Sequence, residues 1–158
     1  MKFTIKDLSL NALAGALYVA LGFAFNFLSF ELVQFRIAEF LLILLLFNPK
    51  FAPGLIIGTF VFNLTSPFGI LDALVGTLAS LVAIILMIVT RKIPLISLIF
   101  PAVANGIIVG AMISSINQIP FFATFGFVFL GELVVMYVIG LPLYYYFKKN
   151  EYILELIS

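Results

Sequence analysis

Long apolar runs, separated by short clusters of Pro, Gly, Asn and charged residues, recur along the whole chain. The runs fall at about 8–28, 36–48, 51–66, 70–90, 94–116 and 122–147. A helix needs about 20 apolar residues to cross a bilayer, and only the second and third runs are clearly shorter than that. The pattern predicts an all-α integral membrane protein in which six transmembrane helices form a single domain over residues 1–158.

The composition agrees with this pattern and excludes several classes of function. Hydrophobic residues make up 65% of the 158 positions and charged residues only 9%, far from the balance of a soluble domain. The absence of Cys and His removes disulfides, thiolate metal sites and the commonest general base. A net charge of +1 argues against a nucleic-acid partner. We therefore expect a membrane protein that is not an enzyme and that uses no metal or cofactor.

The basic residues predict how the helices are oriented. With six spans and a cytoplasmic N-terminus, seven basic residues lie on the inner side and Arg36 alone lies outside. The seven are Lys2, Lys6, Lys50, Arg91, Lys92, Lys148 and Lys149. Because cytoplasmic loops are enriched in Lys and Arg, both termini are predicted to be cytoplasmic and the protein to be multi-pass.

Polar side chains within the runs are rare, and each is costly in a membrane unless it has a partner or a function. Four of them lie near the outer ends of their runs: Arg36, Glu39, Asn63 and Asp72. Asn105 and Glu132 lie deeper, about 11 residues or roughly 16 Å from the outer ends of the fifth and sixth runs. The inner halves hold almost nothing polar, so the sequence predicts a polar cup that opens outward above an apolar floor.

A cup with an apolar floor is typical of ligand capture rather than conduction. A channel needs polar groups along its whole path, and a transporter that works alone needs a midplane site reachable from both sides. The sequence also has no glycine-rich phosphate loop with which to hydrolyse ATP. Active import would therefore require a partner that supplies the energy.

The same polar residues have structural explanations as well. Arg36 and Glu39 are three residues apart and can pair with each other on one helix. Asn63 can cap the end of its own run, and Asp72 suits the N-cap or the first turn of the fourth helix. Glu132 has no basic residue at its depth, so it must carry a proton or bind Asn105 or a ligand.

Two stripes of small residues recur at every fourth position, a spacing that lets membrane helices approach closely. One stripe, in the first run, is Ala12, Ala16 and Ala20. The other, in the fifth run, is Ala102, Gly106, Gly110 and Ser114. Packing within the bundle is the favoured use of the second stripe, because Asn105 would point inward beside it. The first stripe is equally suited to packing and to docking of a partner.

Three stretches of the sequence resemble the QueT family. They are VQFRIAE at 33–39, NLTSPFGILD at 63–72 followed by Gly76-Thr77, and Gly131-Glu132 in the last run. The resemblance covers nearly the whole chain, and the central stretch is its most specific part. It implies a substrate-binding subunit, or S-component, of an energy-coupling-factor (ECF) transporter in a prokaryotic cell membrane, with the six-helix bundle of that class.

The resemblance also implies a ligand and partners. S-components bind a micronutrient or vitamin and associate with a transmembrane coupling subunit and two ATPase subunits. For this family the expected ligand is a queuosine precursor, a 7-deazaguanine base. S-components place the alanine stripe of the first helix against the coupling subunit, which here implies docking through Ala12, Ala16 and Ala20.

The residues suggest how such a base would be held. An ionised carboxylate matches the adjacent N–H and amino donors of a guanine-like edge, and a neighbouring amide serves the ring carbonyl. We expect Glu132 and Asn105 to read that edge and Phe68 to stack on the ring. Asp72 or Glu39 would meet a cationic aminomethyl arm.

Further candidate contacts come from the outer side of the predicted cup. We expect residues 28–35 to fold over the cup as a lid, with Gln34 and Phe35 able to touch the ligand. Arg36 and Asn63 complete the set of candidate ligand-binding residues.

Two other functions compete with this interpretation. One keeps the importer and changes the ligand to another vitamin. The other is an intramembrane enzyme that uses Glu39, Asp72 and Glu132 as acids, which the lack of His, Cys and a paired-carboxylate spacing within one helix disfavours.

Overall fold

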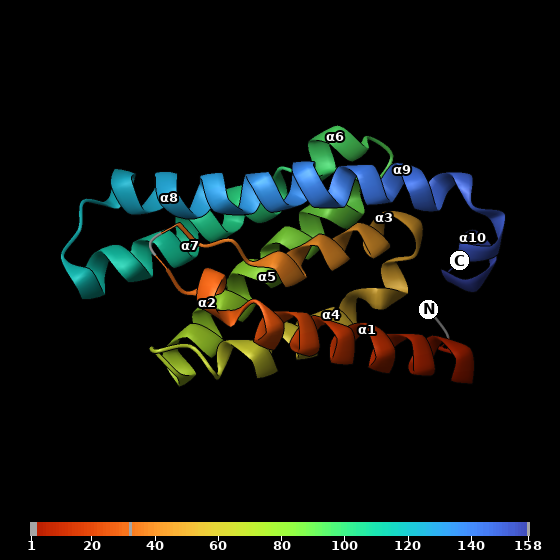
Figure 1. The fold of residues 1–158 in the computed structure, drawn as a ribbon, viewed down its shortest axis with the longest axis horizontal. Coiled ribbons are helices and arrows are strands. Elements are labelled where there is room, and N and C mark those ends of the chain that lie inside the picture. Colours follow the sequence, from red (N-terminus) through yellow and green to blue (C-terminus); the bar gives the residue numbers. More distant parts are fainter. Residues whose placement is uncertain (1–2, 32, 158) are drawn as a thin grey trace.

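The computed structural model describes residues 3–31 and 33–157, and every regular element in those residues is helical (Figure 1). The first half contains α1 (Ile5–Ala24), α2 (Asn26–Ser29), η1 (Ile37–Ile43), α3 (Leu44–Phe47), η2 (Pro49–Phe51) and α4 (Ala52–Asn63). The second half contains α5 (Ile70–Thr90), α6 (Pro94–Ser97), α7 (Phe100–Asn117), α8 (Phe121–Val134), η3 (Val135–Gly140), α9 (Leu141–Lys149) and α10 (Glu151–Ile157).

The helix boundaries follow from local sequence chemistry. Thr4 caps α1 in a reciprocal capping box, in which Asp7 N–H donates to the Thr4 hydroxyl and Thr4 N–H donates to Asp7 Oδ2. Among the described residues, five helices carry a proline in their first turn, where its fixed φ suits helix geometry: η2, α4, α6, α7 and α9. Gly69 supplies the positive φ of 54° at the start of α5.

Within residues 3–31 and 33–157, four helices are long and apolar enough to cross a membrane. They span Ile5–Ala24, Ile70–Thr90, Pro94–Asn117 and Phe121–Lys149. The predicted runs 36–48 and 51–66 fold as shorter helices, namely η1 continued by α3 and the 12-residue α4. The prediction of an all-helical membrane protein is therefore confirmed, with four candidate spans. The other two predicted spans correspond to helices shorter than this length.

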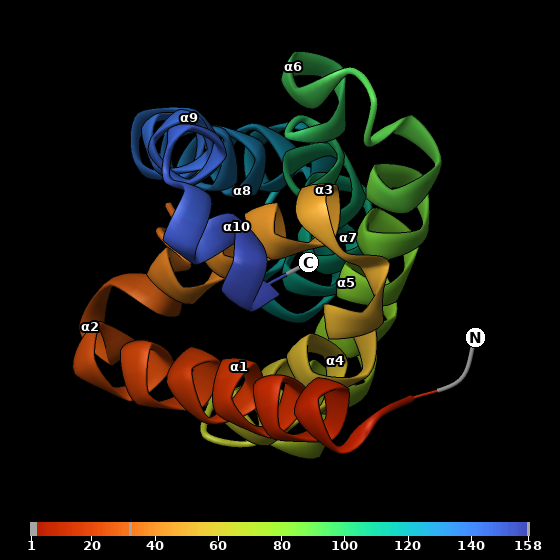
Figure 2. The same cartoon turned by 90° about the vertical axis from the view of Figure 1, so that its right-hand side faces the viewer.

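The short second segment lies at the centre of the bundle rather than on its surface. Figure 2 shows α1 and α4 on one side, α8 and α9 on another, and η1 with α3 between them. Leu42, Ile43 and Leu45 are completely buried there. Because η1 is enclosed by the other helices, the polar residues at its start are enclosed as well.

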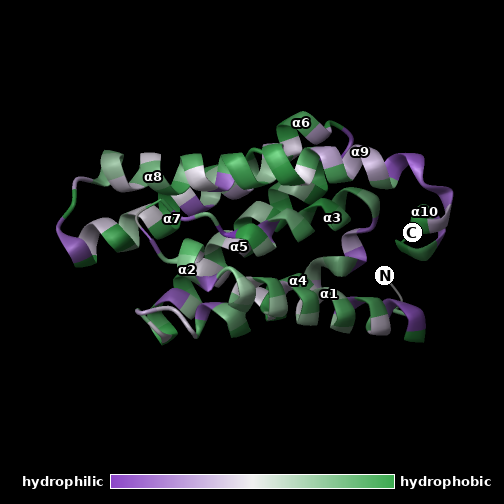
Figure 3. Cartoon of the chain, in the orientation of Figure 1, coloured by the Kyte–Doolittle hydropathy of each residue, from purple (hydrophilic) through white to green (hydrophobic). Residues whose placement is uncertain are grey.

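The outer surfaces of the long helices are apolar, as a lipid-facing surface should be. Many large apolar side chains on them are more than half exposed, such as Leu13, Leu74 and Val138. In Figure 3 the hydrophilic colour gathers at the two ends of the bundle and in its interior.

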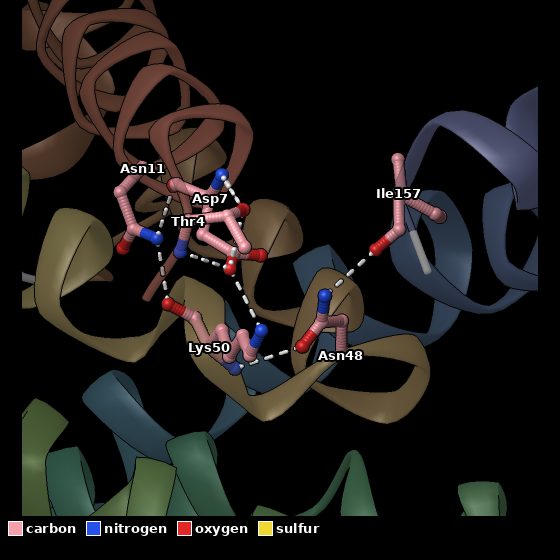
Figure 4. A network of polar contacts seen from close by, with 6 residues as sticks. All are labelled: Thr4, Asp7, Asn11, Asn48, Lys50 and Ile157. Carbon is pink, nitrogen blue, oxygen red and sulfur yellow. Dashed lines mark hydrogen bonds and ion pairs between the residues drawn. The ribbon is translucent and has the colours of Figure 1, made fainter. Parts of the chain in front are cut away.

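A polar network ties the start of α1 to the 48–50 turn and to the end of α10 (Figure 4). We call it the basal network; its residues are Thr4, Asp7, Asn11, Asn48, Lys50 and Ile157. Lys50 Nζ lies 2.7 Å from Asp7 Oδ2, and Asn48 Nδ2 donates to Ile157 O at 3.1 Å. The network places the first turn of α1 and α10 at the same end of the bundle.

Candidate functional site

Six helices contribute polar side chains to one buried site near the centre of the bundle: α1, η1, α4, α5, α7 and α8. We call this site the polar cluster; its residues are Tyr18, Arg36, Glu39, Asn63, Ser80, Asn105 and Glu132. All seven are buried, with at most 1% of any side chain exposed. In an otherwise apolar chain, such a gathering needs either complete internal pairing or a ligand.

Arg36 is the centre of the polar cluster. It directly precedes η1, which turns its side chain into the bundle. Its Nη2 donates to Asn63 Oδ1, its Nη1 donates to Asn105 Oδ1 at 3.5 Å, and the same Nη1 lies 3.9 Å from Glu39 Oε1. A guanidinium presents several donors in a fixed plane, so one side chain can hold groups from α4, α7 and η1 at once.

Glu39 receives its hydrogen bonds on a single oxygen. The hydroxyl of Tyr18 donates to Oε1 at 3.0 Å and the hydroxyl of Ser80 donates to the same atom at 3.3 Å. Arg36 faces that oxygen too. This arrangement leaves the second carboxylate oxygen of Glu39 without a hydrogen-bond partner.

Glu132 is linked to the cation through one amide. Asn105 Nδ2 donates to Glu132 Oε1 at 3.3 Å, while Asn105 Oδ1 accepts from Arg36. The sequence predicted that Arg36 and Glu132 lie at different depths in the membrane. The arginine side chain is long enough to reach Asn105, which binds Glu132, so a basic group lies close to Glu132 after all.

Four buried polar atoms of the polar cluster, and one of Asp72 beside it, lack a hydrogen-bond partner. They are Arg36 Nε, Glu39 Oε2, Asn63 Nδ2, Asp72 Oδ1 and Glu132 Oε2. Three are carboxylate oxygens that accept hydrogen bonds, and two are N–H donors. A buried polar atom without a partner costs about 1–3 kcal/mol, so this pattern favours a ligand that brings the complementary donors and acceptors.

Asp72 borders the polar cluster from the first turn of α5. The N-cap of that helix is Gly69, so Asp72 does not have the capping role that its position allowed. A Cβ atom added to Gly76 would lie 2.5 Å from Asn63 Nδ2 and 3.2 Å from Asp72 Oδ1. The glycine thus leaves room for two unpaired atoms, one donor and one acceptor, on the same side of the site.

The remaining predicted contacts have different positions. Gln34 is buried, and its backbone carbonyl packs so closely on Gly131 that a Cβ there would collide with it. Phe35 is half-buried beside it. Phe68 packs against an apolar cluster formed by α5, α7 and α8. In the predicted lid 28–35, Leu32 lies outside the described residues, as Lys2 does at the N-terminus.

Sequence reasoning missed Tyr18, Ser80 and the aromatic wall beside them. Phe62 is buried, stacks on Phe30 with ring centroids 5.2 Å apart, and meets the Tyr18 ring edge-on at 6.4 Å. Tyr18 was visible in the sequence as the one phenol of the first run. It lies two residues from Ala16 and from Ala20, so it points into the bundle while these small residues are exposed.

The predicted docking residues line a groove on the outer side of α1 and α4. The groove has a volume of about 620 Å³, and its walls include Ala12, Ala16 and Ala20 of α1 and Ile57 and Val61 of α4. The three alanines are exposed, so they do not serve packing within the bundle. In 3–31 and 33–157 no three acidic side chains gather closely enough to hold a metal ion.

Comparison with known proteins gives one family and no individual relative. The sequence model described as QueT transporter matches residues 8–149, which is nearly the whole chain. No curated protein and no solved structure matches.

Proposed function

The chain belongs to the QueT transporter family, and we propose that it is the substrate-binding S-component of an ECF importer for a queuosine precursor. In this proposal it lies in a prokaryotic cell membrane, crosses it six times and keeps both termini in the cytoplasm. The observation that carries the proposal is the polar cluster, a fully buried site with unmatched donors and acceptors inside an apolar bundle. Such a site is suited to hold a small polar ligand rather than to conduct one.

A 7-deazaguanine base complements the unmatched atoms. Glu132 Oε2 has no hydrogen-bond partner and would accept a ring donor, and Asn105 next to it already bridges to the cation. Glu39 Oε2 and Asp72 Oδ1 are further acceptors, which suit a cationic aminomethyl arm. Phe62, which contacts Tyr18 and stacks on Phe30, offers a second aromatic surface, in addition to Phe68, for stacking on the base. Arg36 and Asn63 would hold the cluster together and offer their unpaired N–H donors to the ring carbonyl.

The energy for import would come from a transmembrane coupling subunit with two ATPase subunits. The groove along Ala12, Ala16 and Ala20 supports docking of that coupling subunit, because small exposed residues let a partner helix approach the backbone. In Ala16→Leu the groove would be filled, so uptake should be lost while ligand binding by the isolated subunit persists. Leu13→Ala, also exposed on α1, is the control. Normal uptake in Ala16→Leu would remove the docking role.

Mass spectrometry of the ligand released from protein purified from its native membrane tests the proposed function. The expected result is a stoichiometric, chemically unmodified 7-deazaguanine base. A different vitamin would leave the importer in place and change its ligand. A ligand that is converted during incubation would favour the intramembrane enzyme instead.

A further inference from the structure

Helices α1 and α4 are joined along their length by direct backbone contact. A Cβ on Gly15 would lie 2.7 Å from the carbonyl oxygen of Gly54, and one on Gly58 would lie 2.8 Å from the carbonyl oxygen of Gly15. A Cβ on Gly54 would collide with the carbonyl of Asn11. Contacts this close leave no space for one helix to slide past the other.

Side chains tie the same two helices at the end near the termini. The N–H of Gly54 donates to Asn11 Oδ1 at 2.8 Å, and Asn11 Nδ2 donates to the carbonyl of Lys50 at 2.7 Å. The ion pair between Asp7 and Lys50 lies one turn away (Figure 4). We call α1 and α4 together the α1–α4 unit, since these contacts hold them closely together.

The two sides of the α1–α4 unit face different environments. Its outer side carries the groove, whereas its inner side carries two residues of the polar cluster, Tyr18 and Asn63. On α1 the change of side takes place within two residues, because Ala16 is exposed and Tyr18 is completely buried. Any displacement of Tyr18 therefore moves the groove with it.

The polar contacts that hold the unit in place are the ones a ligand would disturb. Tyr18 shares Glu39 Oε1 with Ser80 and Arg36, while Glu39 Oε2 has no partner. A ligand donor on Glu39 would turn the carboxylate or compete for Oε1, and either change alters the bond from Tyr18. Asn63 has the same relation to the site, with Oδ1 bound to Arg36 and Nδ2 unpaired.

We propose that the α1–α4 unit moves as one body when the polar cluster takes up ligand, with Tyr18 as the positioning residue that transmits occupancy of the cluster to the groove. The proposal rests on the proposed function for the identities of ligand and partner. By thermodynamic linkage, a partner that prefers one position of the unit must also change ligand affinity by the same factor.

Pairs of spin labels test this movement, and the absence of native cysteine makes the labelling specific. Labels at Leu13→Cys and Ile57→Cys report the distance inside the α1–α4 unit. Labels at Leu13→Cys and Leu130→Cys report its position against α8. All three side chains are more than half exposed, so the labels disturb little packing. The measurements are made on the full chain, with and without 7-aminomethyl-7-deazaguanine.

The expected result is an unchanged distance inside the unit and a shifted distance to α8 when the base is added. Tyr18→Phe should broaden the distance to α8 even without the base and abolish the shift, while the internal distance stays the same. Tyr144→Phe, at a buried tyrosine of α9 that packs on Phe47, should behave like wild type.

The outcomes separate this proposal from the proposed function. If the base does not bind at all, the proposed ligand is wrong, yet Tyr18→Phe still decides whether Tyr18 positions the unit. If Tyr18→Phe leaves both distances as in wild type, or if the internal distance changes together with the distance to α8, the proposal of a unit positioned by Tyr18 is overturned.

Discussion

The polar cluster and the basal network are both built around an ion pair in an apolar bundle, but they differ in burial and in how completely their polar atoms are hydrogen-bonded. In the basal network Lys50 and Asp7 are 2.7 Å apart, and Lys50 remains 26% exposed. In the polar cluster Arg36 and Glu39 are 3.9 Å apart and almost completely enclosed. Four atoms of the cluster lack partners, whereas none of the unpaired buried atoms among the described residues belongs to the basal network.

This difference supports the proposal that the polar cluster binds a ligand, whereas the basal network has a structural role. The basal network pairs its groups with helix termini and a turn, and it holds segments distant in sequence together. The polar cluster gathers more charge at greater burial and leaves part of it unmatched, a state that costs stability unless something else supplies the partners. The same type of substitution should therefore have very different effects on ligand affinity in the two networks.

The largest effect is expected from Arg36→Met. The guanidinium donates to Asn63 and Asn105 and faces Glu39, so its loss leaves two buried amide oxygens without a donor and one buried carboxylate without its cation. Breaking a buried pair costs about 3–5 kcal/mol, and about 4 kcal/mol corresponds to roughly a 1000-fold loss of affinity. Isothermal titration calorimetry with 7-aminomethyl-7-deazaguanine measures the loss.

Lys50→Met is the matched control in the basal network, since it removes the cation of the other ion pair. It should bind the base as wild type does. If Arg36→Met does not fold, Arg36→Lys keeps the charge but not the planar set of donors, and roughly a 100-fold loss is then expected from about 2.8 kcal/mol. Equal affinities of the Arg36 and Lys50 variants would end the distinction between the two networks.

The second effect tests the wall of the cluster rather than its charges. Gly131→Ala places a methyl group against the Gln34 carbonyl, which should push the segment leading to Arg36 out of position. Overpacking costs about 1–3 kcal/mol, or roughly a 5- to 150-fold loss in affinity if it falls on the bound state. Gly126→Ala on the same helix meets open space and is the control. Equal affinity in both variants would show that the 34–36 backbone is free to adjust.

A smaller effect is expected from Ser80→Ala. This hydroxyl donates one neutral hydrogen bond to Glu39, which Tyr18 and Arg36 also hold. One such bond contributes about 0.5–1.5 kcal/mol, so affinity should fall by roughly 2- to 10-fold. Ser115→Ala, whose exposed hydroxyl bonds only the preceding turn, should have no effect. A loss above 100-fold would mean that Ser80 contacts the ligand directly.

The smallest effect on binding is expected from Asp7→Asn in the basal network. It removes the charge facing Lys50 and weakens the α1 capping box, so the melting temperature should decrease slightly. Affinity should stay within about twofold of wild type, because well-separated sites act independently. Differential scanning fluorimetry and calorimetry give the two values. A large loss of affinity would mean that the two networks are coupled.

The fold was largely predictable because hydrophobic periodicity and length determine it. The run 70–90 coincides with α5, and the runs 94–116 and 122–147 differ by a residue or two from the helices found. The second and third runs were predicted as spans and fold as shorter helices. Sequence alone does not show that η1 is enclosed by its neighbours, since an apolar run has the same composition whether lipid or protein surrounds it.

The candidate site was predictable in part. Burial cost singled out Arg36, Glu39, Asn63, Asn105 and Glu132, and the structure brings these five together. Depth estimates could not foresee that an arginine side chain joins two levels. Tyr18 and Ser80 were not predicted, because an uncharged hydroxyl costs little free energy to bury in a membrane helix and so does not mark a site. Phe68 packs on apolar residues of α5, α7 and α8, and its stacking on the ligand stays a prediction.

The most direct test of the central claim is the affinity of Glu132→Gln for 7-aminomethyl-7-deazaguanine, measured by calorimetry beside Asp7→Asn. Both changes remove a charge and keep the shape, one in the polar cluster and one in the basal network. Glu132→Gln is predicted to bind roughly 100-fold more weakly, equivalent to about 2.8 kcal/mol, and Asp7→Asn to bind as wild type does. Wild-type affinity in Glu132→Gln alone would move recognition of the base to Glu39 or Asp72. Wild-type affinity in Glu132→Gln, Glu39→Gln and Asp72→Asn together would contradict the claim that the unmatched carboxylates of this site bind the ligand.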